Sequence, residues 1–526
     1  MKRIIRQILG WGMMLTLPLV MTSCGELFDM LDNPITPALQ VLRAQLTLKV
    51  GESKPIQAST QAHVVLLYSS DNPAVATVEA TGLITAVSPG TARITIKAQG
   101  EDDYYRTEIF SENTTTVEVT VSKKDGSISF ATADFTKHVG DAAFTNPVTI
   151  VGDGTVSYSS DNEEVAKVNP TTGEVTIVGK GLATIKATIS DTDKYAYETK
   201  TAQYSLKVTR LVNLATLTSD FTAENYDVLT GTLAGNYKIS IADGANIELK
   251  DVTINGGNNS STNWAGLTCD GNATITITGT NTVKGFYNEY PAIQAGPIGK
   301  TLTIDGTGTL TATGGDYAAG IGSGWNATCG AITISGGTVN ASSGQFGAGI
   351  GSGYSNSSCG DITISGGTVN ASSSRDGAGI GSGYKNSSCK NITISSGTVN
   401  ASSGDAGAGI GSGFDSSSCG DITISGGTVM ASSGRYGAGI GSGYYSTFST
   451  ITITSGITQV QATRNYATAW PIGKGDSDQG STGAVTINGV TVTSNDWDGT
   501  GLTGLNFATS STGGTNLTWT LTPKVP

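Results

Sequence analysis

The chain has 526 residues, more than one compact hydrophobic core usually encloses, so several domains or a long repeat array are expected. It contains 72 glycines but only 13 prolines, and 14% of its residues are charged, which is typical of many short strands joined by tight turns. The net charge of −12 disfavours nucleic acid and anionic lipid headgroups as partners, because phosphate binding requires clustered Lys and Arg. A neutral ligand, or one bridged by cations, suits this charge better.

The first segment has the pattern of an export signal. Positive charge within residues 2–6 precedes a mostly apolar stretch over 8–21, and Met21-Thr22-Ser23-Cys24 follows. The apolar stretch is too short to span a membrane comfortably, so residues 1–23 are predicted to be a signal peptide. The residues before Cys24 resemble the lipobox of bacterial lipoproteins, which implies that Cys24 is acylated and becomes the mature N-terminus. An ordinary signal peptide with an incidental cysteine is the alternative.

Residues 24–38 are predicted to be a linker that follows the lipidated Cys24. Glu26, Asp29 and Asp32 lie just past this cysteine, and they resemble the surface-export signal of some Gram-negative anaerobes. The resemblance implies a lipid-anchored protein of the outer membrane that is exposed at the cell surface. The membrane is then a partner through the lipid anchor.

Residues 39–122 and 127–210 are predicted to form two tandem immunoglobulin-like β-sandwiches. Short alternating runs of apolar and polar residues are separated by turn residues, and the segment 68–72 returns as 158–162. The pattern over Ser69 to Ile94 resembles the bacterial immunoglobulin-like group 2 family, and residues 159–185 match it more loosely. Because such modules occur as spacers and in adhesins, the resemblance implies a stalk more than direct ligand binding.

Beyond residue 213 a glycine-rich block recurs every thirty residues, at 347–353, 377–383, 407–413 and 437–443. Two short alternating strands follow each block. Because neighbouring side chains of a strand point to opposite faces, Thr363, Thr368 and Asn370 are expected to face solvent. The side chains expected to face inward are Ile362, Ile364, Val369, Ala371, Ala378 and Ile380.

One repeat alone cannot bury its apolar face, whereas stacked repeats enclose a continuous core. Residues 213–526 are therefore predicted to form a right-handed parallel β-helix with one thirty-residue coil per repeat, and the whole chain is predicted to be all-β. Antiparallel hairpins, the competing architecture, would not need a constant coil length. A degenerate coil over 229–254 and a terminal strand over 517–521 are expected near the two ends of the helix, because exposed sheet edges must be capped.

Equivalent positions of stacked coils form rows of side chains. One row follows the Gly-Ser-Gly corners and consists of Trp325, Tyr354, Tyr384, Phe414 and Tyr444. Aromatic rings repeated along a surface can stack on sugar rings, so this row is the candidate carbohydrate-binding site. A stack of rings that only seals one corner of the helix is the alternative.

A second row contains Asp361, Asn391 and Asp421. Carboxylate and amide oxygens are ligands of Ca²⁺, so this row is a candidate calcium site, with a solvated face as the alternative. The third row, Asn340, Asn370 and Asn400, is expected to form an amide ladder that stabilises the stack and ends at Met430.

Four cysteines, Cys329, Cys359, Cys389 and Cys419, also recur at thirty-residue intervals. Parallel strands in register keep neighbouring Cβ atoms farther apart than a disulfide prefers. A row of buried reduced thiols is therefore the first interpretation, and disulfides between neighbours or a metal site are the alternatives.

The entry-side residues 227–230 and 236–243, together with the Ala-Gly-Ile-Gly-Ser-Gly corners, resemble those of carbohydrate-binding parallel β-helix proteins. The resemblance implies a polysaccharide partner and bound calcium, but it transfers no individual ligand residue.

Catalysis is not expected, although parallel β-helices also include polysaccharide lyases and hydrolases. The helix region has no histidine, its basic residues are scattered, and it lacks the paired carboxylates that glycoside hydrolysis requires. The sequence therefore predicts a non-catalytic surface lipoprotein that binds plant or host polysaccharide in glycan capture or adhesion. A structural adhesin or stalk that binds a protein partner is the alternative.

Overall fold

The computed structural model describes residues 35–61, 64–100, 111–190, 197–257, 259–476, 483–512 and 515–524. Over these residues the secondary structure consists of strands and one short 3₁₀ helix, η1 (Leu214–Thr216), which confirms the predicted all-β class. None of the described residues belong to a helix that is long and apolar enough to cross a membrane. The predicted signal peptide and Cys24 lie outside the described residues.

The chain divides into two compact units. The first comprises residues 1–135, 143–176 and 183–205, and the second comprises residues 136–142, 177–182 and 206–526.

The N-terminal part of the first unit is a β-sandwich. Its four-stranded sheet has the order β2-β9-β8-β5, a three-stranded sheet has the order β3-β7-β6, and β1 pairs with β4. Ile84 of the smaller sheet and Ile94 and Val119 of the larger one are fully buried in the same core. The strands are β1 (Leu39–Val41), β2 (Gln45–Lys49), β3 (Ser53–Pro55), β4 (Ala58–Thr60), β5 (Val64–Ser70), β6 (Ala76–Val78), β7 (Leu83–Ala86), β8 (Gly90–Gly100) and β9 (Asn113–Ser122).

A second immunoglobulin-like domain follows, and its sheets have the orders β10-β13, β12-β16-β15 and β11-β14-β17-β18. Its strands are β10 (Ser127–Phe130), β11 (Asp134–His138), β12 (Phe144–Thr145), β13 (Val148–Val151), β14 (Thr155–Ser160), β15 (Ala166–Val168), β16 (Glu174–Ile177), β17 (Gly181–Ser190) and β18 (Lys200–Asn213). The predicted pair of immunoglobulin-like domains is thus confirmed.

The repeated Tyr and Gly positions of these domains pack against one another. A Cβ atom on Gly82 would lie 2.8 Å from the ring of Tyr68, and one on Gly173 would lie 2.8 Å from the ring of Tyr158. Both glycines have positive φ, +80° and +72°, which other residues rarely adopt. Each of the two domains therefore contains a glycine turn that is covered by its tyrosine ring.

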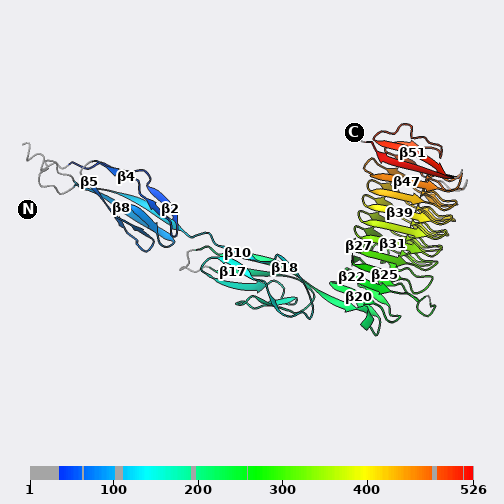
Figure 1. Cartoon of the computed structure of the whole chain (residues 1–526), viewed down its shortest axis with the longest axis horizontal. Coiled ribbons are helices and arrows are strands. Elements are labelled where there is room, and N and C mark those ends of the chain that lie inside the picture. Colours follow the sequence, from blue (N-terminus) through cyan, green and yellow to red (C-terminus); the bar gives the residue numbers. More distant parts are fainter. Residues whose placement is uncertain are drawn as a thin grey trace, which may run out of the picture. The chain divides into compact units, whose positions relative to one another are not determined.

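The second unit contains a β-solenoid of about eight turns, which confirms the predicted parallel β-helix. Its coils are stacked from β20 to the C-terminal β51 in Figure 1. Most strands pair in parallel with the equivalent strand of the next coil, as Ile332 does with Ile362 and Ile362 with Ile392. The last four residues of β18 pair in parallel with β20 and so belong to the first coil.

Each regular coil contributes one strand to each of four rows. Row one is formed by β20 (Asp227–Thr232), β22 (Ala245–Ile254), β24 (Ala273–Thr278), β27 (Thr301–Gly306), β30 (Ala331–Ile334), β34 (Ile362–Ile364), β38 (Ile392–Ile394), β42 (Ile422–Ile424), β46 (Ile451–Ile453) and β49 (Val485–Ile487). Row two is formed by β25 (Thr280–Lys284), β28 (Thr309–Thr313), β31 (Thr338–Ser343), β35 (Thr368–Ser373), β39 (Thr398–Ser403), β43 (Thr428–Ser432) and β47 (Gln459–Arg464).

Row three is formed by β19 (Phe221–Ala223), β21 (Ile239–Ile241), β23 (Leu267–Cys269), β26 (Ile293–Gln294), β29 (Ile321–Gly322), β32 (Ile350–Gly351), β36 (Ile380–Gly381), β40 (Ile410–Gly411), β44 (Ile440–Gly441) and β48 (Ile472–Gly473). The shorter row four is formed by β33 (Ser358–Cys359), β37 (Ser388–Cys389), β41 (Ser418–Cys419) and β45 (Thr447–Phe448).

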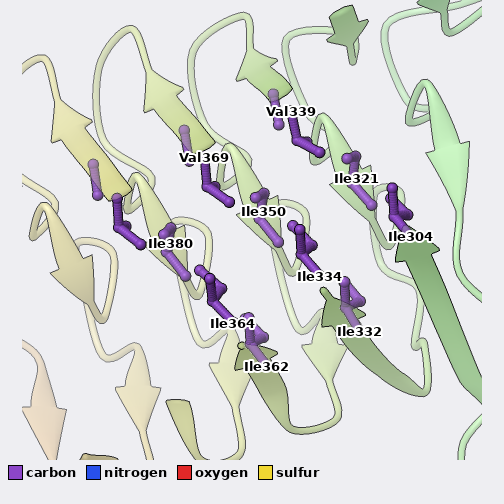
Figure 2. Close-up of a cluster of buried hydrophobic side chains, with 14 of the residues drawn as sticks. Ile304, Ile321, Ile332, Ile334, Val339, Ile350, Ile362, Ile364, Val369 and Ile380 are labelled. Carbon is purple, nitrogen blue, oxygen red and sulfur yellow. The ribbon is translucent and has the colours of Figure 1, made fainter. Parts of the chain in front are cut away.

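Aliphatic side chains from rows one to three fill the interior (Figure 2). Ile362, Val369 and Ile380 are fully buried, whereas Thr363 and Asn370 keep part of their surface in solvent, as the alternation predicts. A fully buried aliphatic side chain contributes about 1.5–3 kcal/mol, so each added coil extends the core by several such contributions.

Glycine is required where row three turns the corner. Gly351, Gly381 and Gly411 have φ near +137°, and a Cβ on any of them would lie within 1.8 Å of the next coil's carbonyl oxygen. The recurring glycine block therefore allows neighbouring coils to approach closely.

The C-terminal end of the helix is closed by antiparallel strands. Here β49 pairs with β50 (Val490–Val492), β51 (Leu505–Thr512) pairs with β52 (Asn516–Pro523), and β52 pairs with β47. Trp519 and Leu521 are fully buried over the last coils. The predicted terminal strand is present, and its reversed direction ends the parallel stacking.

Candidate functional site

Aromatic side chains form two adjacent columns along the helix. The first column contains Tyr354, Tyr384, Phe414 and Tyr444, which the sequence singles out. The second column contains Tyr317, Phe346, Tyr436 and Tyr466, which the repeat pattern does not single out. The two columns lie side by side because their backbones are hydrogen-bonded. The N–H of each first-column residue donates to the carbonyl oxygen at the second-column position one coil earlier, as Tyr384 does to Phe346.

The rings of the first column stack on one another. Centroid distances are 5.3 Å for Tyr354 and Tyr384, 5.1 Å for Tyr384 and Phe414, and 5.5 Å for Phe414 and Tyr444. The ring planes of the last two pairs are within 24° of parallel. These rings are half-buried, so the faces of Tyr384 and Phe414 are occupied by neighbouring rings. A sugar ring can therefore stack face to face only at an end of the column.

The second column is interrupted, which explains why the sequence conceals it. Tyr317 stacks on Phe346 at 5.5 Å, and Tyr436 contacts Tyr466 at 4.9 Å. The two coils between these pairs have Asp376 and Ala406 at this position.

Trp325 stands apart from both columns. It occupies the first-column position of its coil, but among the described residues it makes no ring contact, and Tyr317 takes the place beside Tyr354. Its side chain is 46% exposed. The predicted row of five is therefore a stack of four rings with Trp325 beyond it.

An open cleft lies where the first column ends. It has a volume of about 690 Å³ and is lined by the aromatic residues Tyr444, Tyr445 and Trp470 together with charged and hydroxyl- or amide-bearing side chains. The polar lining residues are Thr468, Lys474, Asp476, Thr493, Ser494 and Asn495. Asp476 accepts a hydrogen bond from the hydroxyl of Thr468. Such a mixture of ring faces and hydrogen-bonding groups is what ligand sites for amphipathic molecules use.

Tyr445 is the most exposed aromatic residue of this cleft, at 43%. Its φ of +51° places it in the left-handed region, as for Ser355, Lys385 and Asp415 in the preceding coils. For a bulky residue this conformation is rare. The ring centroids of Tyr444 and Tyr445 are 4.0 Å apart. The hydrogen bond with Tyr445, followed by burial, raises the pKa of Tyr444 to about 12.

The candidate calcium row has another role in this geometry. The side-chain oxygen of Asp361 accepts the backbone N–H of Asn391 at 3.1 Å, and Asn391 accepts that of Asp421 at 3.0 Å. Hydrogen bonds from Ser449 and Thr450 hold the pKa of the Asp421 carboxyl below its ordinary value. Over the described residues no group of three His, Cys, Asp or Glu side chains converges as a metal site would require. These oxygens therefore cap neighbouring coils, and calcium binding by the row stays a prediction.

The cysteine row lies inside the helix. Cys329, Cys359, Cys389 and Cys419 are buried free thiols, and the Sγ atoms of Cys389 and Cys419 are 2.9 Å apart. A hydrogen bond with Cys329 and burial raise the pKa of the Cys359 thiol well above its ordinary value. All four thiols are therefore part of the buried core of the helix.

The immunoglobulin-like domains and the β-helix together are the domain set of a surface or adhesion-type protein. Residues 35–107 match the family model described as bacterial Ig-like domain (group 2), and residues 151–191 match the intimin immunoglobulin-like domain. Five segments, 302–325, 332–354, 362–384, 392–414 and 422–444, match the beta helix repeat. A comparison with curated proteins finds no match.

Solved structures with local similarity include Drosophila N-cadherin EC1-4, with 11% identity over 37% of this chain and 56% of that one, at a TM-score of 0.16. Human protocadherin-24 EC1-2 has 15% identity over 34% of this chain and 99% of that one, at a TM-score of 0.17. Domains 4 and 5 of the S-layer protein SbsC have 19% identity over 34% of this chain and 99% of that one, at a TM-score of 0.18. The chain thus spans about half the length of the N-cadherin structure.

Proposed function

We propose that this protein is a non-catalytic, lipid-anchored cell-surface protein that binds a plant or host polysaccharide through the cleft at the end of the first aromatic column. The observation that carries the proposal is the cleft itself, where Tyr444, Tyr445 and Trp470 meet polar side chains in a space of about 690 Å³. Both kinds of group are needed, because a sugar ring has apolar faces and a rim of hydroxyl groups.

The side chains of the cleft suit a sugar in distinct ways. The exposed ring of Tyr445 offers the platform that the interior rings of the column lack, since their faces are stacked. Lys474 donates hydrogen bonds, while Asp476 accepts them and Asn495 does both. With one cation and one carboxylate in its lining, the cleft carries no net formal charge, which suits a neutral polysaccharide.

The remaining parts of the chain suit a protein that displays its β-helix at the cell surface. Lipidation of Cys24 would anchor the chain in the outer membrane of a Gram-negative cell, and the two immunoglobulin-like domains would serve as a spacer before the binding unit. The alternative, an adhesin or stalk that recognises a protein through its helix, uses the same anchor and spacer, so the ligand distinguishes the two.

A glycan array of plant and host polysaccharides, probed with the full chain in the presence and absence of a calcium chelator, tests this proposal. We expect binding to at least one class of neutral polysaccharide. If the chelator abolishes binding, calcium is required for recognition of the polysaccharide. If binding survives the chelator, calcium is not required. An array without any binding would leave the protein-binding adhesin as the better description.

A further inference from the structure

A second groove crosses the outer surface of row two and shares no lining residue with the terminal cleft. Its volume is about 470 Å³. The outward side chains of successive strands line it: Thr311, Asn340, Asn370, Asn400, Met430 and Gln461. A parallel line of hydroxyl groups, formed by Ser342, Ser372, Ser402, Ser432 and Thr463, runs beside them.

The asparagines in this groove form a directional ladder, as the sequence predicts. The amide nitrogen of Asn370 donates to Oδ1 of Asn340 at 2.7 Å, and that of Asn400 donates to Oδ1 of Asn370 at 2.7 Å. Each amide oxygen therefore needs a donor from the next coil. This regular arrangement supplies a donor for every oxygen of the ladder except the last.

The ladder breaks at Met430, which is in register with Asn400 on the next strand. A thioether has no hydrogen to donate, so Oδ1 of Asn400 is buried without a hydrogen-bond partner among the described residues. Nearly all buried polar atoms of proteins are paired, and an unpaired acceptor marks a place where a partner is missing. Met430 itself is 41% exposed, with a flexible side chain that can move aside.

We propose that this end of the groove binds the acetamido group of an N-acetylated amino sugar. The amide N–H of the sugar donates to Oδ1 of Asn400, and its methyl group packs against the thioether of Met430. The hydroxyl groups of Ser402 and Ser432 bond the hydroxyl groups of the sugar ring. A secondary amide carries both a donor and an acceptor, so it completes the ladder as another asparagine would.

An extended peptide, which also carries amide groups, fits this groove less well. Peptides usually join sheets by adding a strand at a free edge. The floor of this groove is the middle of a sheet, where β39 is already paired with β35 on one side and β43 on the other. The groove also lacks apolar pockets for alternate side chains, whereas its hydroxyl groups suit a saccharide.

Binding of short oligosaccharides to the full chain tests this proposal. The probes are oligomers of N-acetylglucosamine and of glucose of equal length, which are both neutral and differ in the acetamido group. We expect the acetylated oligomer to bind the wild type at least about tenfold more tightly, because only this ligand pairs the buried acceptor. Equal affinities for the two oligomers would overturn the proposal.

Two substitutions of Met430 test whether the preference for the acetylated oligomer arises in the groove. Met430→Asn supplies the missing donor from within the protein and should abolish the preference for the acetylated oligomer, whereas Met430→Leu supplies none and should retain it. Thermal unfolding confirms that both variants fold. If Met430→Asn keeps the wild-type preference, the groove is not the site.

Binding in the groove can be distinguished from binding in the cleft. Tyr445→Ala should leave the preference for the acetylated oligomer intact, because the two sites share no residue. If Tyr445→Ala abolishes this preference and Met430→Asn does not, the acetylated sugar binds in the cleft: the groove proposal then fails while the proposed function stands.

Discussion

The ring of Tyr384 lies almost parallel to that of Phe414, with centroids 5.1 Å apart and 8° between the ring planes. Their spacing is close to the distance between neighbouring coils, so the stack is a direct product of the parallel β-helix. This stacking covers the ring faces within the column, so Tyr445 is the exposed ring at its end.

Loss of a ring from the middle of the stack should destabilise the helix. Phe414→Ala removes contacts with both neighbouring rings and is expected to lower the free energy of unfolding by about 2 kcal/mol, less than for a fully buried ring. Chemical denaturation measures this change. Trp325→Ala is the matched control, because its exposed ring lies outside the stack, and it should change stability by less than about 0.5 kcal/mol. Equal effects of the two substitutions would contradict the stacking.

Asp227 should make the second unit sensitive to acid. Its carboxylate is fully buried and accepts hydrogen bonds from Arg210 at 2.6 and 2.8 Å and from Lys180 at 2.9 Å. Burial alone would raise the pKa of Asp227, but Arg210, the backbone N–H of Glu224 and Lys180 outweigh it and hold this pKa below its ordinary value. The contribution to stability is therefore complete above about pH 4 and is lost as the pH falls through the lowered pKa.

Asp227→Asn tests this contribution. The variant should be less stable at pH 7 by about 3 kcal/mol, because two cations lose their buried partner. Its unfolding temperature should also depend less on pH below pH 4 than that of the wild type. Parallel acid dependence in the two proteins would show that Asp227 does not carry the effect.

The thiols of the helix interior should resist alkylation. Cys359, Cys389 and Cys419 are buried, and burial raises the pKa of the Cys389 thiol well above its ordinary value, with a further contribution from its hydrogen bond with Cys419. We expect iodoacetamide at pH 8 to leave these residues unmodified in the native protein and to modify all of them in denaturant, as peptide mass spectrometry would show. Rapid modification of the native protein would contradict the burial of these thiols.

Replacement of a corner glycine should disrupt the stack. In Gly381→Ala the new Cβ would lie 1.8 Å from the carbonyl oxygen of Gly411, at a φ of +137°. We expect a loss of about 3 kcal/mol or more in the free energy of unfolding. Gly257→Ala is the control, because no atom lies within 4 Å of its added Cβ. A wild-type unfolding temperature for Gly381→Ala would contradict the close approach of the coils.

Repetition decides how much of this architecture the sequence reveals. Ile362 and Val369 recur with a fixed alternation, so their burial follows from the period, and Asn370 can be placed beside Asn340 and Asn400 for the same reason. The reversed direction of β52 has no such signal, because a terminal strand reads the same in a parallel or an antiparallel pairing.

The cleft is harder to find because it belongs to the irregular end of the helix. Trp470 precedes an imperfect copy of the glycine block at β48, Asn495 comes from a segment without a repeat, and only the fold brings them beside Tyr445. The second aromatic column is equally hidden, because Asp376 and Ala406 interrupt the spacing between Phe346 and Tyr436. Repeats therefore predict rows, but they do not predict which row ends in an open space.

Titration calorimetry tests whether the cleft binds the polysaccharide that the full chain recognises on the array. The affinity of the wild type is compared with that of Tyr445→Ala. Tyr317→Ala is the matched control, since it removes an exposed ring that does not line the cleft. We predict that Tyr445→Ala weakens binding at least about tenfold, or about 1.4 kcal/mol, while Tyr317→Ala leaves the affinity unchanged. Unchanged affinity in Tyr445→Ala would contradict polysaccharide binding by the cleft.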